Sequence, residues 1–354
     1  MKVLLVEDSM VVARYVLSVL EEEDSITVLP QAKNGSEAVE YSKAYRPDVI
    51  LMDLILPDFS GIEAIRRIMA ELPVPIIVLS SAVDSSTGGE DELTYESFNA
   101  GAVKVLAKPK GVEQEDYRSF RTQLLRTIRI FSQVKVVRRN YSQNDNHVVS
   151  ENKLSDAMSV DNNSCKLVVI GASTGGPSVL KSLLMKIEKP LNIPILISQH
   201  ITQGFEQGLA DWLSKTGHEV ILANEELPVE NKVYLSPADR HLVVRQNRIS
   251  FEPKAPGNLL CPEIDRLFVS AAEYCGSGAA GIVLCGMGTD GTKGAGAILR
   301  AGGRIIAQEP ETCIVSSMPD SVINLGSDVE VAHPDIIGNW LADLNKKEKA
   351  GTVG

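Results

Sequence analysis

Residues 166–177 read KLVVIGASTGGP, and this stretch decides how the second half of the chain folds. An apolar run that predicts a buried strand stops at Gly171. A helix is expected to begin at Pro177, because proline suits a first helical position. Ser173 is therefore expected in a tight turn, beside free backbone N–H groups and the positive end of a helix dipole. Such a turn suits a nucleophile whose reaction forms an oxyanion, and it equally suits a bound phosphate.

Length and composition restrict the class of protein that this sequence can encode. A chain of 354 residues predicts two domains, and 44% hydrophobic residues are enough for two sizeable cores. The net charge of −11 argues against nucleic acid as a partner. No apolar run has the length of a membrane span, and the N-terminus lacks the pattern of a signal peptide. Five scattered cysteines are expected to be reduced. We expect a cytoplasmic protein that is not inserted in a membrane.

Residues 1–130 predict a doubly wound α/β domain with a five-strand parallel sheet, because short apolar runs alternate with amphipathic helical patterns. The predicted strands are Val3–Val6, Val28–Gln31, Val49–Met52, Ile76–Leu79 and Val103–Ala107. The predicted helices lie near Met10–Glu22, Gly35–Tyr45, Gly61–Glu71 and Thr87–Ala100, with another from about Gln114. In such a sheet the ligand site lies beyond the carboxyl ends of the strands.

Five polar side chains are predicted at that edge of the sheet. Glu7 and Asp8 follow the first strand, Asp53 ends the third, Ser80 ends the fourth, and Lys108 follows the fifth. Three carboxylates at one place would repel one another without a cation, and Mg²⁺ bound by oxygen ligands would suit them. A lysine and a hydroxyl across the same pocket suit a phosphoryl group attached to Asp53.

This domain resembles the receiver domains of response regulators. The likeness rests on Glu7-Asp8-Ser9, Asp53 with Pro57 and Gly61, Ser80-Ser81, Gly101-Ala102 and Lys108-Pro109. The resemblance implies that Asp53 accepts a phosphoryl group from a two-component histidine kinase. It also implies Glu7, Asp8 and Asp53 as Mg²⁺ ligands, and Ser80 and Lys108 as phosphate contacts.

Two further expectations come from the same resemblance. The Lys108–Pro109 peptide bond is expected to be cis. Val105 occupies the position where the family usually has the phenylalanine or tyrosine whose rotation reports phosphorylation. The phosphorylation chemistry itself does not depend on that ring.

The rest of the chain is predicted as a linker, a second domain and a short tail. The arginine-bearing helical pattern that begins at Gln114 runs to Val137, and residues 138–164 beyond it are rich in Asn, Ser and Asp. We expect a flexible linker over residues 131–165. Residues 166–347 predict a second doubly wound domain with a mostly parallel mixed sheet, in which Val229–Phe251 forms antiparallel hairpins. Residues 348–354 are the tail.

Three segments of the second domain together predict a serine-nucleophile site. The segment 171–175 matches G-x-S-x-G, the nucleophile-elbow pattern. His200 follows the next strand, and Asp290 lies in a second glycine-rich turn after another strand. Ser173, His200 and Asp290 could therefore form a Ser-His-Asp triad, with Ser173 as the nucleophile and His200 as the base. Backbone N–H groups of Thr174 and Met287 would form the oxyanion hole.

Other interpretations of these segments stay open. Asp290 is also a natural N-cap for the helix that follows it. The order serine, acid, histidine found in α/β-hydrolases would make His333 a rival base. Dinucleotide binding at Gly171–Gly176 would need an acid about 20 residues further on, and Gln199-His200 stands there instead.

The whole chain resembles the chemotaxis response-regulator protein-glutamate methylesterases. Besides the triad segments, the likeness covers residues 236–242 (SPADRHL), 265–272 (DRLFVSAA), 307–309 (AQE) and 318–319 (MP). The resemblance implies hydrolysis of glutamyl methyl esters on methyl-accepting chemoreceptors, with release of methanol, and deamidation of receptor glutamines. It implies no cofactor for the esterase reaction. It also implies that the unphosphorylated receiver covers the active site and that phosphorylation at Asp53 relieves this inhibition.

The sequence departs from the family pattern at two places near the predicted site. Thr289 stands where asparagine is more usual, and Asp265 follows Cys-Pro-Glu-Ile instead of Arg-Pro-Ser-Val.

Two functions of other classes compete with the esterase. One is a regulatory module that docks a partner without catalysis, and the other is a nucleotide-binding output domain.

Overall fold

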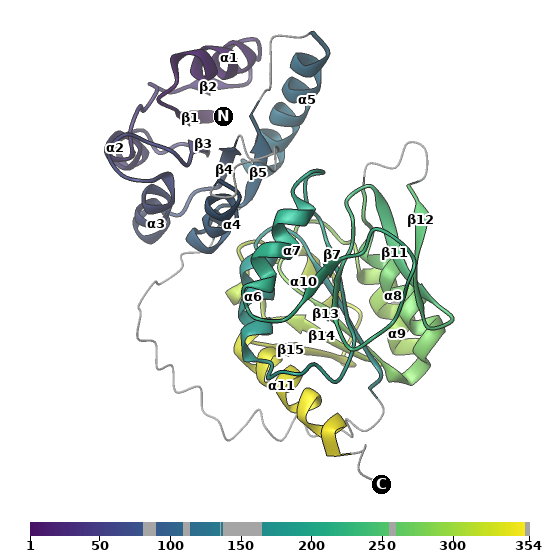
Figure 1. The fold of residues 1–354 in the computed structure, drawn as a ribbon. Coiled ribbons are helices and arrows are strands. Elements are labelled where there is room, and N and C mark those ends of the chain that lie inside the picture. Colours follow the sequence, from purple (N-terminus) through teal and green to yellow (C-terminus); the bar gives the residue numbers. More distant parts are fainter. Residues whose placement is uncertain (81–89, 109–113, 135, 137–164, 255–259, 351–354) are drawn as a thin grey trace. The chain divides into compact units, whose positions relative to one another are not determined.

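The computed structural model describes residues 1–80, 90–108, 114–134, 136, 165–254 and 260–350 (Figure 1). The chain divides into two units, Met1–Tyr141 and Ser142–Gly354. Most of the expected linker lies outside the described residues. At the other end, helix α11 (Pro334–Ala350) extends into the predicted tail.

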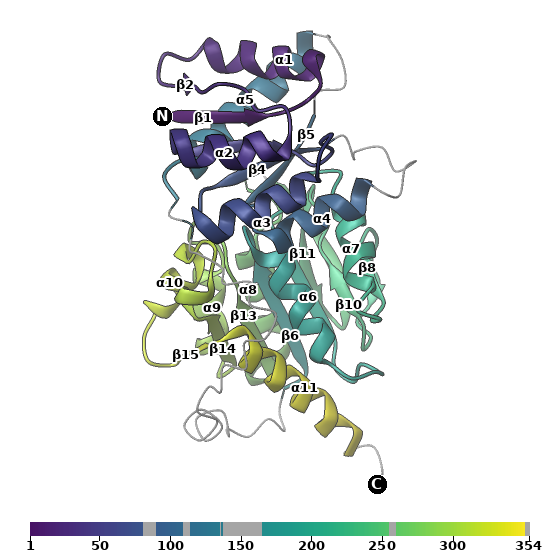
Figure 2. The ribbon, with the colours of Figure 1, turned by 90° about the vertical axis from the view of Figure 1, so that its left-hand side faces the viewer.

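The first unit has the five-strand parallel sheet that the sequence predicted, in the order β2-β1-β3-β4-β5. Helices α1 and α5 cover one face of this sheet, and α2, α3 and α4 cover the other (Figures 1 and 2). The strands are β1 (Lys2–Val6), β2 (Thr27–Val28), β3 (Val49–Asp53), β4 (Ile76–Ser80) and β5 (Lys104–Ala107). The helices are α1 (Met10–Glu21), α2 (Gly35–Tyr45), α3 (Gly61–Glu71), α4 (Glu90–Ala100) and α5 (Gln114–Phe131).

Burial explains why the central strands of this unit could be found in the sequence. Every residue of β3 (VILMD) and of β4 (IIVLS) is buried, as expected for parallel strands covered on both faces. Helix α3 packs close to the end of β3 because its first residue is glycine. A Cβ on Gly61 would lie 2.1 Å from the Asp53 carbonyl oxygen. The start of α3 therefore lies directly against the backbone of Asp53, at the carboxyl end of β3.

The second unit is built on a seven-stranded sheet in the order β15-β14-β13-β6-β7-β10-β8. Its strands are β6 (Leu167–Ala172), β7 (Ile195–Gln199), β8 (Val220–Leu222), β10 (Val233–Leu235), β13 (Ala279–Val283), β14 (Arg304–Gln308) and β15 (Val329–Ala332). Its helices are α6 (Gly176–Lys186), α7 (Glu206–Ser214), α8 (Ile264–Cys275), α9 (Thr292–Arg300), α10 (Ser317–Ile323) and α11. Helices α8 and α9 pack together on one face of the sheet, and α6 and α11 pack together on the other (Figures 1 and 2).

The antiparallel strands do not join the main sheet, which differs in detail from the mixed sheet expected there. All pairs in the seven-stranded sheet are parallel. The hairpin of β11 (Arg240–Arg245) and β12 (Arg248–Pro253) forms a separate sheet with β9 (Leu227–Pro228). Strand β10 was expected within a hairpin but lies parallel between β7 and β8. Its three residues are all buried, which a position inside a covered parallel sheet requires.

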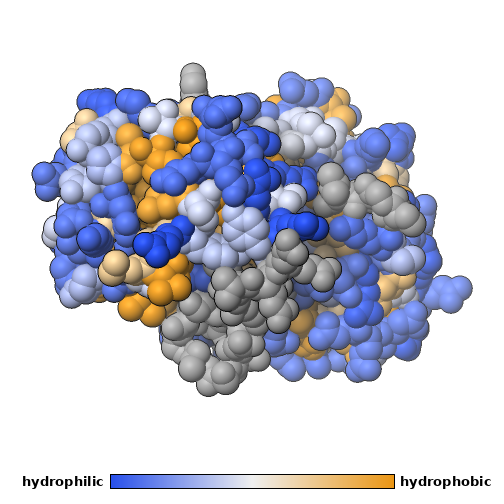
Figure 3. All heavy atoms as spheres, turned by 90° about the horizontal axis from the view of Figure 1, so that it is seen from above, coloured by the Kyte–Doolittle hydropathy of each residue, from blue (hydrophilic) through white to orange (hydrophobic). Residues whose placement is uncertain are grey.

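One buried apolar cluster of the second unit joins strands of the sheet to α8. Val169 of β6 and Val283 of β13 belong to one buried cluster with Phe268 of α8. The face of the molecule in Figure 3 is mostly hydrophilic, with apolar side chains gathered in a few places. Within the described part of the chain, every helix is too short or too polar to pass through a lipid bilayer.

We expect Gly61→Ala to destabilise the first unit by about 1–3 kcal/mol, because the added methyl group would overlap the Asp53 backbone. Thermal unfolding of the full chain measures the effect. Gly296→Ala in α9 is the matched control, since its added Cβ meets only the flexible tip of Arg300 at 3.2 Å. Alanine is the better helix former, so this control should not lose stability. Equal unfolding temperatures for Gly61→Ala and wild type would contradict the close packing of α3.

Candidate active site and phosphorylation site

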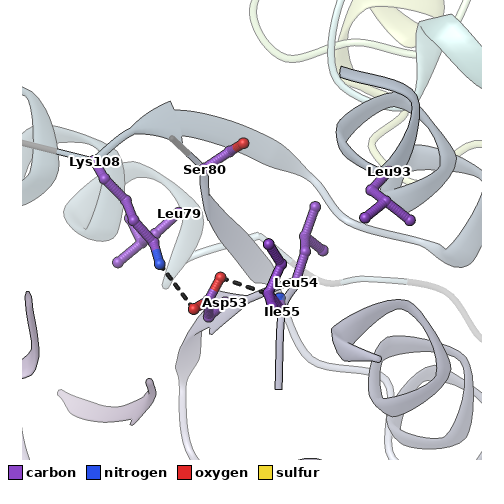
Figure 4. A pocket seen from close by; sticks show the side chains of 7 residues that line it. All are labelled: Asp53, Leu54, Ile55, Leu79, Ser80, Leu93 and Lys108. Atoms are coloured by element: carbon purple, nitrogen blue, oxygen red, sulfur yellow. Dashed lines mark hydrogen bonds and ion pairs between the residues drawn. The ribbon is translucent and has the colours of Figure 1, made fainter. Parts of the chain in front are cut away.

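The charged residues predicted to meet in the first unit do lie together, at the carboxyl edge of its sheet. Glu7 follows β1, Asp53 ends β3 and Lys108 follows β5. The Lys108 ammonium lies 2.8 Å from Asp53 Oδ2 and 3.0 Å from Glu7 Oε2. Figure 4 shows Lys108 pointing at Asp53 across a small pocket whose wall includes Leu54. The edge thus holds an aspartate paired with a lysine, as a phosphoryl-accepting site needs.

The three acidic side chains predicted as metal ligands form one cluster. One carboxylate oxygen from each of Glu7, Asp8 and Asp53 lies within 4.8 Å of the other two. Glu7 and Asp53 are buried, whereas Asp8 is exposed. Burial and the charge of Asp53 raise the pKa of Glu7 to about 7. The cluster carries more negative charge than Lys108 alone balances, and its oxygen ligands fit a hard divalent cation such as Mg²⁺.

Ser80 lies beside this cluster, but its hydroxyl is directed elsewhere. The Ser80 hydroxyl is hydrogen-bonded to Thr94 Oγ1 of α4 at 2.9 Å, and both side chains are buried. In Figure 4 it points away from the Asp53 carboxylate. A contact with a phosphoryl group on Asp53 would require this hydroxyl to rotate. The expected cis bond at Lys108–Pro109 and the residue Ser81 lie outside the described residues.

The second unit brings its predicted acid and base into contact. Ser173 directly follows β6, His200 directly follows β7, and Asp290 lies in the loop after β13. These three strands are neighbours in the sheet, so the three residues share one edge. His200 Nε2 lies 2.8 Å from Asp290 Oδ2. Because Nε2 is occupied by the aspartate, Nδ1 is the His200 nitrogen that remains for the serine.

Asp290 is held by the start of α8, a helix from a different part of the chain. The backbone N–H groups of Ile264 and Asp265 donate to its carboxylate at 2.7 and 3.0 Å, and that of Gly291 donates at 2.9 Å. Burial alone would raise the pKa of Asp290. The hydrogen bond and charge of His200 and the two α8 N–H groups outweigh burial and hold this pKa below its usual value. Asp290 is therefore ionised wherever His200 could act as a base.

The alternative interpretation of Asp290 as the N-cap of the helix that follows it is wrong, because α9 has Gly291 at its N-cap. The Asp290 carboxylate instead accepts N–H groups at the start of α8. In return, Asp265 Oδ1 in the first turn of α8 accepts from the Gly294 N–H in α9 at 2.8 Å. The N-terminus of α8 thus receives the carboxylate of Asp290 from the loop before α9, and the N-terminus of α9 receives that of Asp265 from α8. Sequence reasoning gave Asp265 no role, because its partner is 29 residues away.

Close backbone packing brings the turn after β6 against the turn after β13. The Ser173 N–H donates to the Cys285 carbonyl at 3.0 Å. A Cβ on Gly286 would lie 2.7 Å from Ser173 Cβ, so only glycine fits at that position. Helix α6 begins at Gly176, one residue before the predicted start, after Gly175 with a φ of 84°. The two glycine-rich turns therefore pack directly against each other at Ser173.

The predicted oxyanion donors are in the two turns that meet at Ser173. Within the described residues, the N–H groups of Thr174 and Met287 donate to no backbone carbonyl. The Met287 side chain is 37% exposed, so this turn borders solvent. No hydrogen bond joins Ser173 Oγ to His200 in the described part of the chain, and catalytic contacts of this kind often close only when substrate binds.

The other described histidines have structural partners. His218 Nε2 contacts the Ile187 carbonyl at 3.0 Å, and His241 Nδ1 accepts from the Glu263 N–H at 3.0 Å. His333 Nδ1 accepts from the Asp335 N–H at 3.1 Å at the start of α11. His333 follows β15 at the outer edge of the sheet, whereas His200 follows a strand next to β6. Geometry favours His200 over its rival as the base.

Comparison with known proteins identifies the family. A family model for the response regulator receiver domain matches residues 3–116, and one for CheB methylesterase matches residues 168–341. A protein-glutamate methylesterase/protein-glutamine glutaminase of Methanospirillum hungatei is 34% identical over 98% of this chain and 99% of its own. The chain belongs to this family. The corresponding protein of Hahella chejuensis is 37% identical over 97% of this chain and 98% of its own. The resemblance found in the sequence is thus confirmed.

A solved structure covers the methylesterase part of the chain. The catalytic domain of Thermotoga maritima CheB is 36% identical and spans 51% of this chain and 99% of that domain, with a TM-score of 0.48.

One departure from the usual methylesterase sequence lies next to Asp290, the acid of the predicted triad. The segment Cys261–Ile264 leads into α8, where the Ile264 N–H donates to Asp290. Glu263 is the N-cap residue of α8, and its side chain makes no capping hydrogen bond. The contacts that this segment makes with Asp290 therefore use its backbone. The unusual side chains therefore leave the hydrogen bond from Ile264 to Asp290 intact.

Asp290→Asn is expected to lower kcat about a thousand- to ten-thousandfold, because the amide no longer fixes the His200 tautomer. It should also lower stability at pH 7 by about 1–3 kcal/mol, since two α8 N–H groups lose their ionised acceptor. The pKa of Asp290 is lower in the folded chain than in the unfolded chain. Its contribution to stability is therefore fully present above the unfolded pKa of about 4, and it is lost as the pH falls through the lower folded pKa. Acid unfolding of Asp290→Asn should accordingly depend less steeply on pH.

Asp265→Asn is the matched control at the reciprocal cap. Burial raises the pKa of Asp265, so its ionisation opposes folding at neutral pH, and an asparagine oxygen can still accept from Gly294. We expect kcat within about threefold of wild type and no loss of stability at pH 7. A similar loss of kcat in both variants would show that kcat depends on the carboxylates at the two helix N-termini and not on the contact between Asp290 and His200.

Proposed function

We propose that the chain is a phosphorylation-activated serine hydrolase that demethylates glutamyl methyl esters on methyl-accepting chemoreceptors and deamidates receptor glutamines. We place this activity in the cytoplasm. The observation that carries the proposal is the 2.8 Å contact between His200 and Asp290, at the same sheet edge as the Ser173 turn. The family membership adds the kind of ester and amide on which such a site acts.

In the proposed reaction, Ser173 Oγ attacks the ester carbonyl carbon of the methylated glutamate. His200 Nδ1 takes the hydroxyl proton, and the negative charge that forms on the carbonyl oxygen lies near the N–H groups of Thr174 and Met287. One such donor is typically worth about 3 kcal/mol in the transition state. The tetrahedral intermediate collapses when His200 returns its proton to the departing methanol. With a glutamine substrate, the same proton goes to the departing ammonia.

Water then completes the reaction. His200 Nδ1 takes a proton from water, whose oxygen attacks the acyl carbon on Ser173. The proton next passes to Ser173 Oγ as the glutamate leaves. Asp290 stays ionised throughout, because its α8 N–H contacts and His200 hold its pKa low. It keeps the proton of neutral His200 on Nε2 and stabilises the imidazolium in both halves of the reaction.

The receiver unit would supply the control. Asp53 would accept a phosphoryl group from a histidine kinase, with Mg²⁺ held by Glu7, Asp8 and Asp53 to neutralise the charge during transfer. Lys108, now 2.8 Å from Asp53, is placed to pair with the new phosphoryl oxygens. Rotation of the Ser80 hydroxyl away from Thr94 would add a further contact. We expect this phosphorylation to raise the esterase rate.

Ser173→Ala should reduce methanol release from methylated receptor membranes by at least about a thousandfold, since it removes the nucleophile. The assay uses the full chain with acetyl phosphate. Diisopropyl fluorophosphate should label wild type at Ser173 and leave Ser173→Ala unlabelled. A docking module without catalysis would show neither methanol release nor labelling. Full methanol release by Ser173→Ala would disprove the proposal.

Asp53→Asn should remove the activation of methanol release by acetyl phosphate while leaving the unstimulated rate in place. Removing Mg²⁺ with EDTA should abolish activation of wild type in the same way, because the acidic cluster then lacks its cation. Methanol release with and without acetyl phosphate measures both effects. Activation that persists in Asp53→Asn would place the phosphorylated residue elsewhere.

A further inference from the structure

The side chain of Gln199 connects the turn of the nucleophile to the residue of the base. Gln199 is the last residue of β7, and its side chain is buried. Its Nε2 donates to the carbonyl oxygen of Ser173 at 3.0 Å and to that of His200 at 2.9 Å. One amide group therefore touches the backbone of both residues that exchange the proton in the reaction.

The orientation of this amide follows from its partners. Both neighbours are carbonyl oxygens, so the NH₂ end must face them. The other end, Oε1, is buried and accepts no hydrogen bond within the described residues. It lies 2.6 Å from the position that a Cβ on Gly176 would take. A buried oxygen without a donor destabilises a fold relative to an apolar side chain of the same shape. What a glutamine provides here, and an apolar side chain would not, is the two hydrogen bonds that its NH₂ group donates.

The hydrogen bond from Gln199 to the Ser173 carbonyl oxygen also affects the direction of the Thr174 N–H. The parallel ladder between β6 and β7 ends where the His200 N–H donates to the Ala172 carbonyl at 3.0 Å. Beyond that point, the Ser173 carbonyl accepts from Gly176 within its own turn and from Gln199 across the sheet. This carbonyl shares one planar peptide unit with the N–H of Thr174. Fixing the direction of the carbonyl therefore fixes the direction of the Thr174 N–H.

We propose that Gln199 is a positioning residue of the esterase. Through the Ser173–Thr174 peptide it aims the Thr174 N–H at the oxyanion, and through the His200 carbonyl it holds the base at a fixed distance from the serine. This inference rests on the proposed roles of Ser173, His200 and Thr174. It deepens them by naming the group that sets their mutual geometry before substrate arrives.

Gln308 offers a matched control in the same sheet. It is the last residue of β14 and is fully buried. Its Oε1 accepts from the Cys285 N–H at 2.8 Å, and its Nε2 donates to Thr312 Oγ1 at 3.0 Å. Gln308 thus reaches over the end of a neighbouring strand as Gln199 does. The peptide it binds, however, contains neither oxyanion donor.

The test compares Gln199→Met with Gln308→Met in the full chain, with acetyl phosphate present. Methionine keeps the length of the side chain and removes its hydrogen bonds. For Gln199→Met we expect kcat for methanol release to fall about ten- to a hundredfold, with KM within about threefold of wild type. The midpoint of the pH–rate profile should not move, because the contact between His200 and Asp290 remains. For Gln308→Met we expect kcat within about threefold of wild type.

The rate of labelling by diisopropyl fluorophosphate gives a second readout that does not depend on the natural substrate. Labelling of Ser173 also passes through an oxyanion, so it should slow in parallel with kcat in Gln199→Met. Gln199→Leu, which is smaller and also lacks N–H donors, replaces Gln199→Met if the latter does not fold. Methanol release that is absent even from wild type would contradict the proposed function, and the labelling rates would still decide the role of Gln199.

Three results would overturn the positioning role. One is a kcat and a labelling rate within threefold of wild type in the Gln199 variant. Another is a loss that lies wholly in KM. The third is an equal loss of kcat in Gln308→Met, which would mean that any buried glutamine at this edge has the same effect.

Discussion

The second unit depends on two carboxylates that lie at helix N-termini, Asp290 of the loop before α9 at the start of α8 and Asp265 of α8 at the start of α9. Asp290 receives two N–H groups from the start of α8, and Asp265 receives one from the first turn of α9. These contacts keep Asp290 ionised although it is buried, which is the condition for orienting His200. The same contacts fix the two helices that cover one face of the sheet. The same hydrogen bonds therefore keep the Asp290 carboxylate charged and hold the N-terminal ends of α8 and α9 together.

Both units place their chemistry at the carboxyl edge of a parallel sheet, and the sequence shows why that edge was predictable. Ser173, His200 and Asp53 each come at the end of a short apolar run, and such runs are recognisable as buried strands. Their meeting at one edge follows from parallel pairing alone. The five-strand parallel sheet of the first unit and the pairing of His200 with Asp290 could therefore be foreseen.

What the sequence could not predict is which distant groups meet. Strand β10 was assigned to a hairpin because its run of three residues carries no mark of parallel pairing, which only its two neighbours impose. The alternative interpretation of Asp290 made it the N-cap of the helix beside it, since a local pattern cannot show that the start of α8 lies against its carboxylate. The hydroxyl of Ser80 could be placed at the edge, but its hydrogen bond to Thr94 depends on how α4 packs. Long-range packing decides all three.

The use of His200 Nε2 by Asp290 sets a limit on how far the base can reach. The nitrogen left for Ser173 is Nδ1, which is bonded to the ring carbon nearest the backbone, so the serine must come close to the main chain of His200. Adjacent strands satisfy this requirement, because their ends lie about 4.8 Å apart. A slip of one residue between β6 and β7 would move the two groups apart by about 3.3 Å. The register between β6 and β7 therefore sets the distance between Ser173 and His200, the proposed nucleophile and base.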